Sequence, residues 1–253
     1  MSLALKGVLE KLDKELQPEL FKDYCPNGLQ VEGCEQVRKI VTGVTACFDL
    51  IDRAVALKAD ALLVHHGYFW RGEEAVITGM KRRRIERLLE NKISLIAYHL
   101  PLDAHPKLGN NAQLAKLMGW SVEGGLDPRE KFPIGNWGEV PETLSLTDFG
   151  FNVQQKLGRQ PLLIPGGDHE IKTIAWCTGA AQSMINQALD LGVDAFISGE
   201  ISESTVHFAR ENGIHYISAG HHATERYGVQ ALANWLEQET GIEHEFVDID
   251  SPV

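Results

Sequence analysis

The chain has 253 residues, of which 43% are hydrophobic and 23% are charged, and its formal net charge at pH 7 is -11. This composition is typical of a globular protein and excludes bulk disorder, a collagen-like chain and a disulfide scaffold. No apolar run is long enough to cross a bilayer, and residues 1–15 lack the apolar core of a secretory signal. The acidic balance argues against nonspecific binding to nucleic acid or anionic membranes. Four cysteines without C-x-x-C spacing indicate reduced thiols in a cytoplasmic protein.

The first half of the chain alternates helical and strand patterns. Apolar residues at helical spacing predict a helix over residues 4–20. Further along, the pattern predicts strands over residues 39–45, 61–64 and 93–98, and helices over residues 49–58, 82–90 and 110–118. This alternation indicates an α/β fold with mostly parallel sheets.

Residues 124–141 interrupt the alternation, because they combine glycine, proline, tryptophan and charged residues without periodicity. We interpret them as a connector or a small irregular meander. The chain is therefore predicted to form two α/β lobes, residues 1–124 and 125–253, and the last helix can pack back on the first lobe. In the second lobe we predict helices over residues 143–157, 183–191, 205–211 and 224–239, and strands over residues 171–177, 195–198 and 214–218.

The two halves of the chain resemble each other. Residues 40–67 align without a gap with residues 174–201, which places Asp60 opposite Asp194. Shared apolar periodicity is the alternative explanation, but polar positions match as well as apolar ones. The alignment therefore favours an internal duplication.

Residues that can bind metals follow four of the predicted strands. They are His65-His66, His99, Glu200 and His221-His222. Ligands of open α/β sheets gather outside the carboxyl ends of the strands, which is where these side chains are expected. Imidazole together with carboxylate suits Zn, Mn, Fe, Ni or Co. Two such ions form a common hydrolytic centre that activates a water molecule.

Spacing strengthens the interpretation as a metal site. His221 and Glu225 lie four residues apart at the start of a predicted helix and therefore share one face. His65 and His66 follow a buried strand, and Asp103 follows another. Each feature alone has a structural explanation, such as a surface ion pair or a core histidine beside a surface one. Together these five residues predict a metal site.

Two further residues have more than one interpretation. His99 is either a ligand or a residue that orients another ligand. Glu200 is a general base, an acceptor that orients a ligand, or a helix cap. Four other histidines are expected to be structural or at the surface, with a minor claim for His207 as a site residue: His105, His207, His215 and His244.

Other segments have both a functional and an ordinary structural interpretation. Residues 178–183 are either a phosphate-binding loop or, as we favour, a plain turn between a strand and a helix. Residues 68–71 (YFWR) are either a stacking surface for a base or ring or an aromatic lid at a subunit contact. Residues 81–84 (KRRR) are expected to be a solvated helix start rather than a nucleic-acid site. The sequence lacks a P-loop, H-E-x-x-H and G-x-S-x-G.

Several motifs together resemble one known family. They are HHGYFW at residues 65–70, HLPLDAHPKLGNNAQLA at 99–115, DAFISGEISE at 194–203, AGHHATERYG at 219–228 and PNGLQVEG at 26–33. Over nearly its whole length the chain resembles the GTP cyclohydrolase I type 2 homologue family, also called the NIF-three-like family. The resemblance implies two similar α/β lobes with a dinuclear metal site between them. It also implies assembly into a toroidal homohexamer.

The resemblance also assigns ligands to two divalent metal ions. His65 and Asp103 would hold one ion, His66 and His221 the other, and Glu225 would bridge them. Five ligands for two ions leave open coordination positions, as catalysis requires. We therefore expect a metal-dependent hydrolase acting on a small phosphorylated or nucleotide-like molecule. The alternative is a non-catalytic metal-binding adaptor, sensor or metal-trafficking protein. Cyclohydrolase activity does not follow from the family's name, since no cysteine lies beside the predicted ligands in the sequence.

Overall fold

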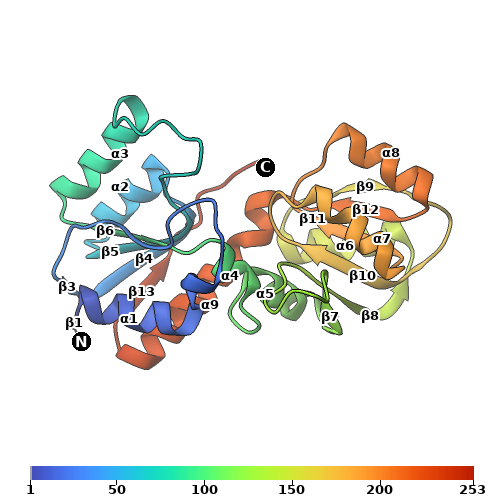
Figure 1. Ribbon diagram of the computed structural model, residues 1–253, viewed down its shortest axis with the longest axis horizontal. Coiled ribbons are helices and arrows are strands. Elements are labelled where there is room, and N and C mark those ends of the chain that lie inside the picture. Colours follow the sequence, from blue (N-terminus) through green and yellow to red (C-terminus); the bar gives the residue numbers. More distant parts are fainter. Residues whose placement is uncertain (1) are drawn as a thin grey trace. The chain divides into compact units, whose positions relative to one another are not determined.

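The structure, a computed structural model, describes residues 2–253 and divides into two units (Figure 1). Unit 1 contains the chain up to Leu102 together with Val229–Asp250, and unit 2 contains Asp103–Gly228 and Ser251–Val253. This division differs from the predicted boundary at residue 124. The chain passes into unit 2 within helix α4 (Leu100–Ala104) and returns to unit 1 within helix α9 (His221–Thr240). Across residues 2–253, every helix is too short or too polar to span a membrane.

Unit 1 is built on a five-stranded sheet with the strand order β13-β4-β5-β6-β2. Every pair of neighbours is parallel except β2 and β6. The strands are β2 (Gly28–Val31), β4 (Lys39–Thr45), β5 (Ala61–His66), β6 (Ser94–Ala97) and β13 (Glu243–Phe246).

Helices cover both faces of this sheet (Figure 1). On one face lie α2 (Phe48–Ala56) and α3 (Gly79–Glu90), and on the other lie α1 (Leu5–Leu16) and the C-terminal part of α9. A short pairing of β1 (Leu3–Ala4) with β3 (Gln36–Val37) and a 3-10 helix over Pro18–Leu20 complete the unit.

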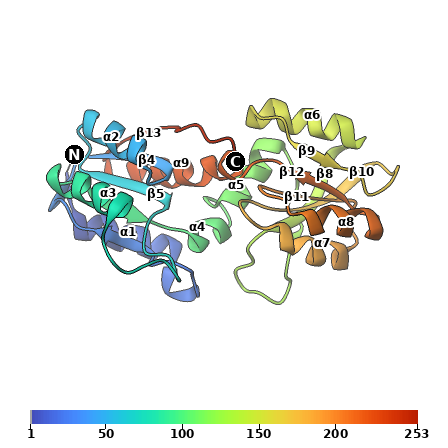
Figure 2. The ribbon, with the colours of Figure 1, turned by 90° about the horizontal axis from the view of Figure 1, so that it is seen from above.

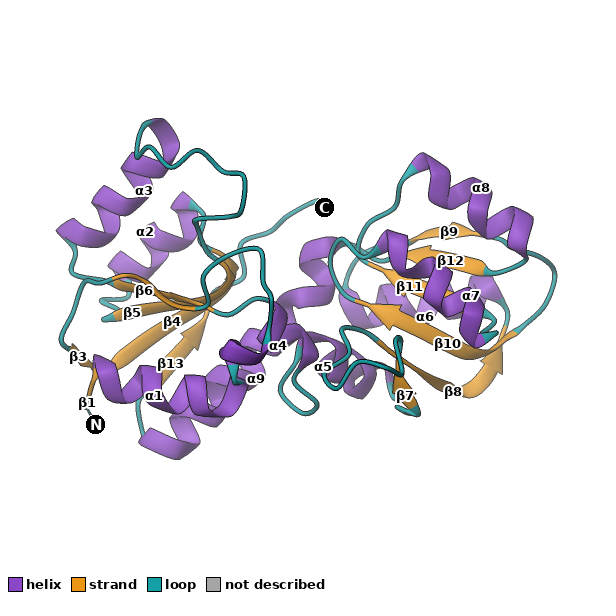
Figure 3. Cartoon of the chain, in the orientation of Figure 1, coloured by secondary structure: helices purple, strands orange, loops and turns teal. Residues whose placement is uncertain are grey.

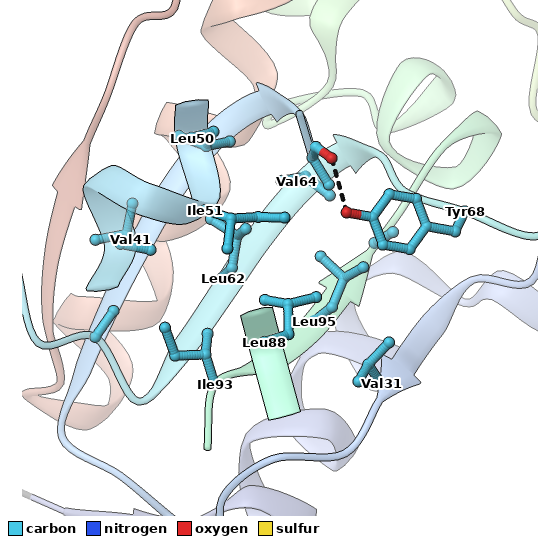
Figure 4. Close-up of a cluster of buried hydrophobic side chains, with 14 of the residues drawn as sticks. Val31, Val41, Leu50, Ile51, Leu62, Val64, Tyr68, Leu88, Ile93 and Leu95 are labelled. Carbon is cyan, nitrogen blue, oxygen red and sulfur yellow. Dashed lines mark hydrogen bonds between the residues drawn. The ribbon is translucent and has the colours of Figure 1, made fainter. Parts of the chain in front are cut away.

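The core between the sheet and α2 and α3 is shown in Figure 4. Leu50 and Ile51 of α2 and Leu88 of α3 pack in one buried cluster with residues of β4, β5 and β6. Tyr68 belongs to the same cluster, and its hydroxyl donates to the carbonyl oxygen of Ala46 at 2.8 Å. The first residue of the YFWR segment is therefore a core residue and not part of an exposed stacking surface.

Unit 2 contains a six-stranded sheet with the strand order β7-β8-β10-β11-β12-β9 (Figure 3). β10 (Ile171–Cys177), β11 (Ala195–Ser198) and β12 (His215–Ser218) are parallel to one another. β7 (Gly124–Gly125), β8 (Asn136–Leu144) and β9 (Leu162–Ile164) pair antiparallel with their neighbours.

The helices of unit 2 lie on opposite faces of its sheet (Figure 2). α5 (Asn110–Met118) and α6 (Leu146–Leu157) pack on one face around the buried side chains of Trp120, Phe149 and Trp176. α7 (Ile185–Leu191), which a 3-10 helix over Gln182–Met184 precedes, and α8 (Glu203–Asn212) lie on the other face.

The prediction of an irregular segment over residues 124–141 holds for residues 126–135, which are neither helix nor strand, and fails for the rest. Most of its second part is strand β8, which pairs antiparallel with β10 through Asn136 and Trp176 and through Gly138 and Ile174. Only Gly138 and Val140 of this strand are buried, so the sequence shows no alternation of apolar and polar residues. The structure also contains β2, β9 and β13, which were not predicted because they are short, and β13 is mostly polar.

The predicted first helix ends earlier than expected. α1 stops at Leu16 because Gln17 adopts a left-handed conformation with φ 48°, and Pro18 then begins a 3-10 helix. Proline lacks the amide hydrogen that a continuing α-helix requires.

The two units have matching topologies. In unit 1, β4, β5 and β6 are parallel and β2 joins antiparallel, and in unit 2, β10, β11 and β12 are parallel and β9 joins antiparallel. The internal repeat seen in the sequence therefore corresponds to a repeat in the fold.

Candidate metal centre

Three histidines of unit 1 cluster at the carboxyl ends of β5 and β6. His65 and His66 are the last two residues of β5, and His99 follows β6. Each offers a ring nitrogen, and these three atoms all lie within 4.8 Å of one another. His65 is fully buried, whereas His66 and His99 are half-buried.

Two of these rings have a defined proton position. Nδ1 of His65 lies 2.9 Å from the carbonyl oxygen of Tyr98, and Nδ1 of His99 lies 2.7 Å from a carboxylate oxygen of Asp23. Both partners are acceptors, so each neutral ring carries its proton on Nδ1 and a lone pair on Nε2. Metal-binding histidines commonly have this arrangement, because the second hydrogen bond sets the ring's orientation.

Asp23 and Asn27 hold His99 in place. The carboxylate of Asp23 accepts hydrogen bonds from the amides of Tyr24 and Leu100, from Nδ2 of Asn27 and from Nδ1 of His99. Burial alone raises the pKa of Asp23, but the hydrogen bonds from His99 and Asn27 lower it to about 2. Asn27 also accepts the backbone N–H of His99 at 2.7 Å. From the sequence we predict no role for Asp23 or Asn27; Asn27 belongs to the PNGLQVEG motif, whereas Asp23 lies outside it.

The indole of Trp70 forms one wall of the histidine cluster. Its ring centroid lies 5.0 Å from that of His99 at an interplanar angle of 84°, and 5.9 Å from that of His66. The indole N–H donates to the carbonyl oxygen of Gly67 at 3.2 Å, which fixes the ring. Of the two interpretations of the YFWR segment, these contacts favour an aromatic cover over a surface for stacking a base.

Two buried carboxylates of unit 2 lie near the carboxyl end of β10. Asp103 accepts hydrogen bonds from Nδ2 of Asn110 at 2.9 Å and from the hydroxyl of Thr178 at 3.5 Å. Glu225 lies against Gly179, where an added Cβ would collide with its Oε1 atom. Asp103 is 6% exposed and Glu225 3% exposed. Because buried charges are normally paired or bound to a metal, these two carboxylates fit a cation site.

The negative charges of these carboxylates also affect the thiol of Cys177, the last residue of β10. Burial raises the pKa of its thiol, and the charges of Asp103 and Glu225 raise it further. In the metal-free chain both effects disfavour the thiolate form of Cys177.

His221 contacts two carboxylates. Its Nδ1 lies 2.7 Å from Oε1 of Glu200, and its Nε2 lies 3.1 Å from Oε2 of Glu225. Burial alone lowers the pKa of His221, but the hydrogen bonds and charges of Glu225 and Glu200 raise it to about 9. A cation at Nε2 would substitute for the proton there, while Glu200 keeps the proton on Nδ1. The donor set of unit 2 therefore fits a metal ion.

Glu200 forms hydrogen bonds through its side chain and its backbone. Its carboxylate orients His221, and its carbonyl oxygen accepts a hydrogen bond from the hydroxyl of Tyr216. Ser202 rather than Glu200 occupies the N-cap position of α8.

The four histidines expected to be structural or at the surface lie outside these clusters. His215 is buried and hydrogen bonds to backbone at both ring nitrogens, and His105 accepts two backbone amides in a turn. His207 is exposed on α8, and His244 contacts Glu237 and Asn234.

The turn after β10 is an ordinary one. The amides of Thr178, Gly179 and Ala181 donate to side-chain oxygens of Asn111, Thr224 and Ser198 respectively. These amides are therefore already satisfied within the chain and do not form a phosphate-binding loop.

The basic run at residues 81–84 lies within α3. Lys81 and Arg82 form ion pairs with Glu73 and Glu86 at 3.2 and 2.6 Å. The positive charge of these two residues is thus partly neutralised within unit 1.

Comparison with known proteins identifies the family. The sequence profile described as Duf34/NIF3 (NGG1p interacting factor 3) matches residues 3–252. The chain belongs to the Duf34/NIF3 family. This NIF3-family chain is 55% identical to the "GTP cyclohydrolase 1 type 2 homolog" of Pseudomonas aeruginosa over 100% of both proteins. It is 54% identical to the protein of the same name from Vibrio cholerae over 96% of both.

The fold of the NIF3-family chain agrees with that of a solved relative. It is similar to protein ybgI, described as of unknown function, with a TM-score of 0.95 and 49% sequence identity over 99% of this chain and 100% of that one. The resemblance inferred from the motifs is therefore confirmed, and so is the prediction of two α/β lobes with mostly parallel sheets.

Proposed function

We propose that this NIF3-family chain binds two divalent metal ions and hydrolyses a small phosphorylated or nucleotide-like molecule. One observation carries the proposal: His65 and His221 each donate Nδ1–H to a fixed acceptor, so that the lone pair that a metal ion would bind is on Nε2. The residues that would hold the metal ions are His65, His66, Asp103, His221 and Glu225.

The donor set decides which ions suit the chain. Imidazole and carboxylate ligands favour Zn, Mn, Fe, Ni or Co over alkaline-earth ions. Such ions, when bound, supply an activated water molecule and stabilise negative charge on the attacked group. The protein's contribution is to orient the ligands: Glu200 holds His221 and Asn110 holds Asp103.

His99 can transfer a proton to or from a reacting group. Because Asp23 accepts its Nδ1–H at 2.7 Å, the Nε2 atom is the position at which the ring exchanges a proton with a reacting group. Asp23 is then a positioning residue. We assign Glu200 an orienting role rather than that of a general base, since its Oε1 atom is engaged by His221.

Metal content and turnover test the proposal. The parent chain is compared with Glu225→Ala and with Glu239→Ala, a control on the same helix that lies at the surface and forms a 3.9 Å ion pair with Lys11. We expect about two ions per chain in the parent and in the control, and depletion in Glu225→Ala. Turnover of a panel of phosphorylated and nucleotide substrates, GTP included, is expected to follow metal content. No bound metal after reconstitution would contradict the proposal.

The same experiment distinguishes the second candidate function. Two ions per chain without turnover across a broad panel would favour a metal-binding adaptor, sensor or trafficking protein. Fast exchange of the metal with a chelator would then point to trafficking.

Assembly into a homohexamer is a further part of the proposal. Three large apolar side chains close together in the sequence are exposed, with Val76 at 59%, Ile77 at 50% and Met80 at 57%. Exposed apolar clusters commonly mark contacts between chains. Light scattering of the purified protein tests the assembly, and a monomer at micromolar concentration would contradict it.

A further inference from the structure

Arg159 of unit 2 carries a guanidinium group without an internal partner. Its Nη1 atom is buried and has no hydrogen-bond acceptor anywhere in residues 2–253. A buried donor left unpaired is costly, and more so on a charged group. Arg159 as a whole is half-buried, so an acceptor from solution can reach its side chain.

The position of Arg159 in the fold indicates where that acceptor would bind. The residue lies between α6 and β9, and Leu162 at the start of β9 pairs with Ser218 at the carboxyl end of β12. Ligands of open α/β sheets bind outside the carboxyl ends of the parallel strands. His221 follows the same strand β12, so Arg159 and His221 lie at the same edge of the unit 2 sheet.

Gly220 brings the guanidinium close to the backbone next to His221. A Cβ added at Gly220 would lie 2.7 Å from Nη1 and 2.9 Å from Nε of Arg159. Gly220 also has φ +99°, a conformation that other residues rarely adopt. The guanidinium thus packs on the α-carbon that immediately precedes His221.

Neighbouring charged groups do not neutralise Arg159. Arg226 of α9 donates from Nη2 to the carbonyl oxygen of Leu157, the last residue of α6, at 2.6 Å and so has a structural role. None of the ion pairs found in residues 2–253 involves Arg159. A positive charge at the ligand-binding edge, next to a proposed metal ligand, suits an oxyanion.

We propose that Arg159 binds the phosphate group of the small molecule on which the chain acts. The planar fork of guanidinium N–H groups matches the oxygens of a phosphate. This inference rests on the proposed function for the identity of the substrate, but the anion site itself requires no metal. It narrows the substrate class to phosphate monoesters and nucleotides.

The test measures binding of inorganic phosphate to metal-free protein by isothermal titration calorimetry. Arg159→Met keeps a long apolar side chain but removes the charge, and Arg159→Lys keeps the charge but removes the fork. Arg129→Met is the matched control, because it removes the same charge from unit 2 at an exposed guanidinium that pairs with Asp127 at 2.7 Å. We expect Arg159→Met to weaken phosphate binding about tenfold or more, Arg159→Lys to weaken it less, and the control to match the parent.

Chemical rescue and a second anion sharpen the test. Arg159→Ala is expected to regain phosphate affinity when guanidinium ion is added, which a merely structural role would not produce. Acetate is expected to bind more weakly than phosphate to the parent, and tighter binding of acetate would overturn the assignment to phosphate. Equal phosphate affinity in the parent and in Arg159→Met would overturn the proposal itself.

These measurements distinguish a failure of the anion-site proposal from a failure of the proposed function. If the parent never binds metal but Arg159→Met still loses phosphate affinity, the hydrolase proposal fails and the anion site stands. Thermal denaturation shows whether each variant is folded, and if Arg159→Met is not, a loss of affinity in Arg159→Lys decides. Once a substrate is known, Arg159→Met is expected to raise KM more than it lowers kcat, with metal content unchanged.

Discussion

Asp60 and Asp194 make the same hydrogen bonds in the two units. Oδ2 of Asp60 accepts the N–H of Lys39 in β4 at 3.1 Å, and Oδ2 of Asp194 accepts the N–H of Thr173 in β10 at 2.8 Å. In both units the amide of the preceding residue donates to the same oxygen. Each carboxylate therefore binds the beginning of the neighbouring parallel strand. The duplication seen in the sequence extends to the hydrogen bonds that set this strand pairing.

Removing one of these carboxylates is expected to destabilise its unit. Asp194→Ala leaves two strand amides without their acceptor, which costs about 2 kcal/mol of unfolding free energy. Urea unfolding at pH 7 measures the loss. Asp190→Ala, at an exposed position of α7, is the control and should change stability by less than about 0.5 kcal/mol. Equal losses in both variants would contradict the assigned role.

The same variant has an expected pH dependence. Burial alone raises the pKa of Asp194, but the hydrogen bonds from Thr173 and Lys172 outweigh it and lower the pKa below its usual value. Its stabilising contribution is therefore complete above the unfolded pKa of about 3.9 and is lost as the pH falls through the folded pKa. The difference between the parent and Asp194→Ala should shrink when unfolding is measured below that range. A difference that grows on acidification would contradict this assignment.

His215 is expected to make unit 2 less stable in mild acid. Its Nδ1 accepts the N–H of Gly166 at 3.1 Å and its Nε2 donates to the carbonyl oxygen of His169 at 2.9 Å, so the buried ring is neutral. Burial lowers its pKa below 6.5. Between pH 6.5 and the lower folded pKa the unfolded chain binds the extra proton, and stability falls as the pH falls through this window.

Replacing His215 tests that dependence. His215→Phe should reduce the slope of unfolding free energy against pH by up to about 1.4 kcal/mol per pH unit. The exposed ring of His207 offers the control, and His207→Phe should keep the slope of the parent. An unchanged slope in His215→Phe would show that the ring is already protonated in the folded state or titrates normally.

Two glycines with the same backbone conformation should respond differently to alanine. Gly179 and Gly192 both have φ +70°, but an added Cβ at Gly179 collides with Glu225, whereas nothing lies within 4 Å at Gly192. Both variants are expected to lose about 1 kcal/mol of stability from backbone strain. Only Gly179→Ala should also lose bound metal, because Glu225 must move. Metal analysis of the two purified variants checks this. Equal metal content in the two variants would contradict a role of Glu225 in metal binding.

Asp23 is expected to affect activity through His99. Asp23→Asn removes the carboxylate that accepts Nδ1–H, so the ring can adopt the other tautomer and rotate. We expect kcat/KM to fall by about 10- to 100-fold on a substrate found in the screen, with little change in metal content. Glu19→Gln is the control, since it removes one negative charge at an exposed position of unit 1. In proton NMR spectra, Asp23→Asn should shift the His99 Nδ1–H resonance upfield, and an unshifted resonance would contradict the positioning role.

Segments with a strong periodic pattern were predicted to the residue. The strands over Lys39–Thr45, Ile171–Cys177 and Ala195–Ser198 and the helix over Asn110–Met118 have the predicted bounds. The three strands among these segments are runs of mostly buried residues, and the local composition of the sequence reveals such runs. β8 and β13 were missed because their pairing with β10 and β4 comes from distant parts of the chain, and their own residues alternate poorly.

The sequence by itself determined the family, the fold class and the chemical types that gather after the strands, because these are properties of local pattern and motif. The partners of those residues were decided only by tertiary structure. Asp23 and His99 are 76 residues apart, and Thr178 and Asp103 are 75 apart. The sequence does not show whether an aspartate or an arginine in a loop is solvated or buried. Packing removes water from Asp23 and from Nη1 of Arg159. A polar group without water needs a hydrogen-bond partner, so the tertiary structure determines what these two residues can do.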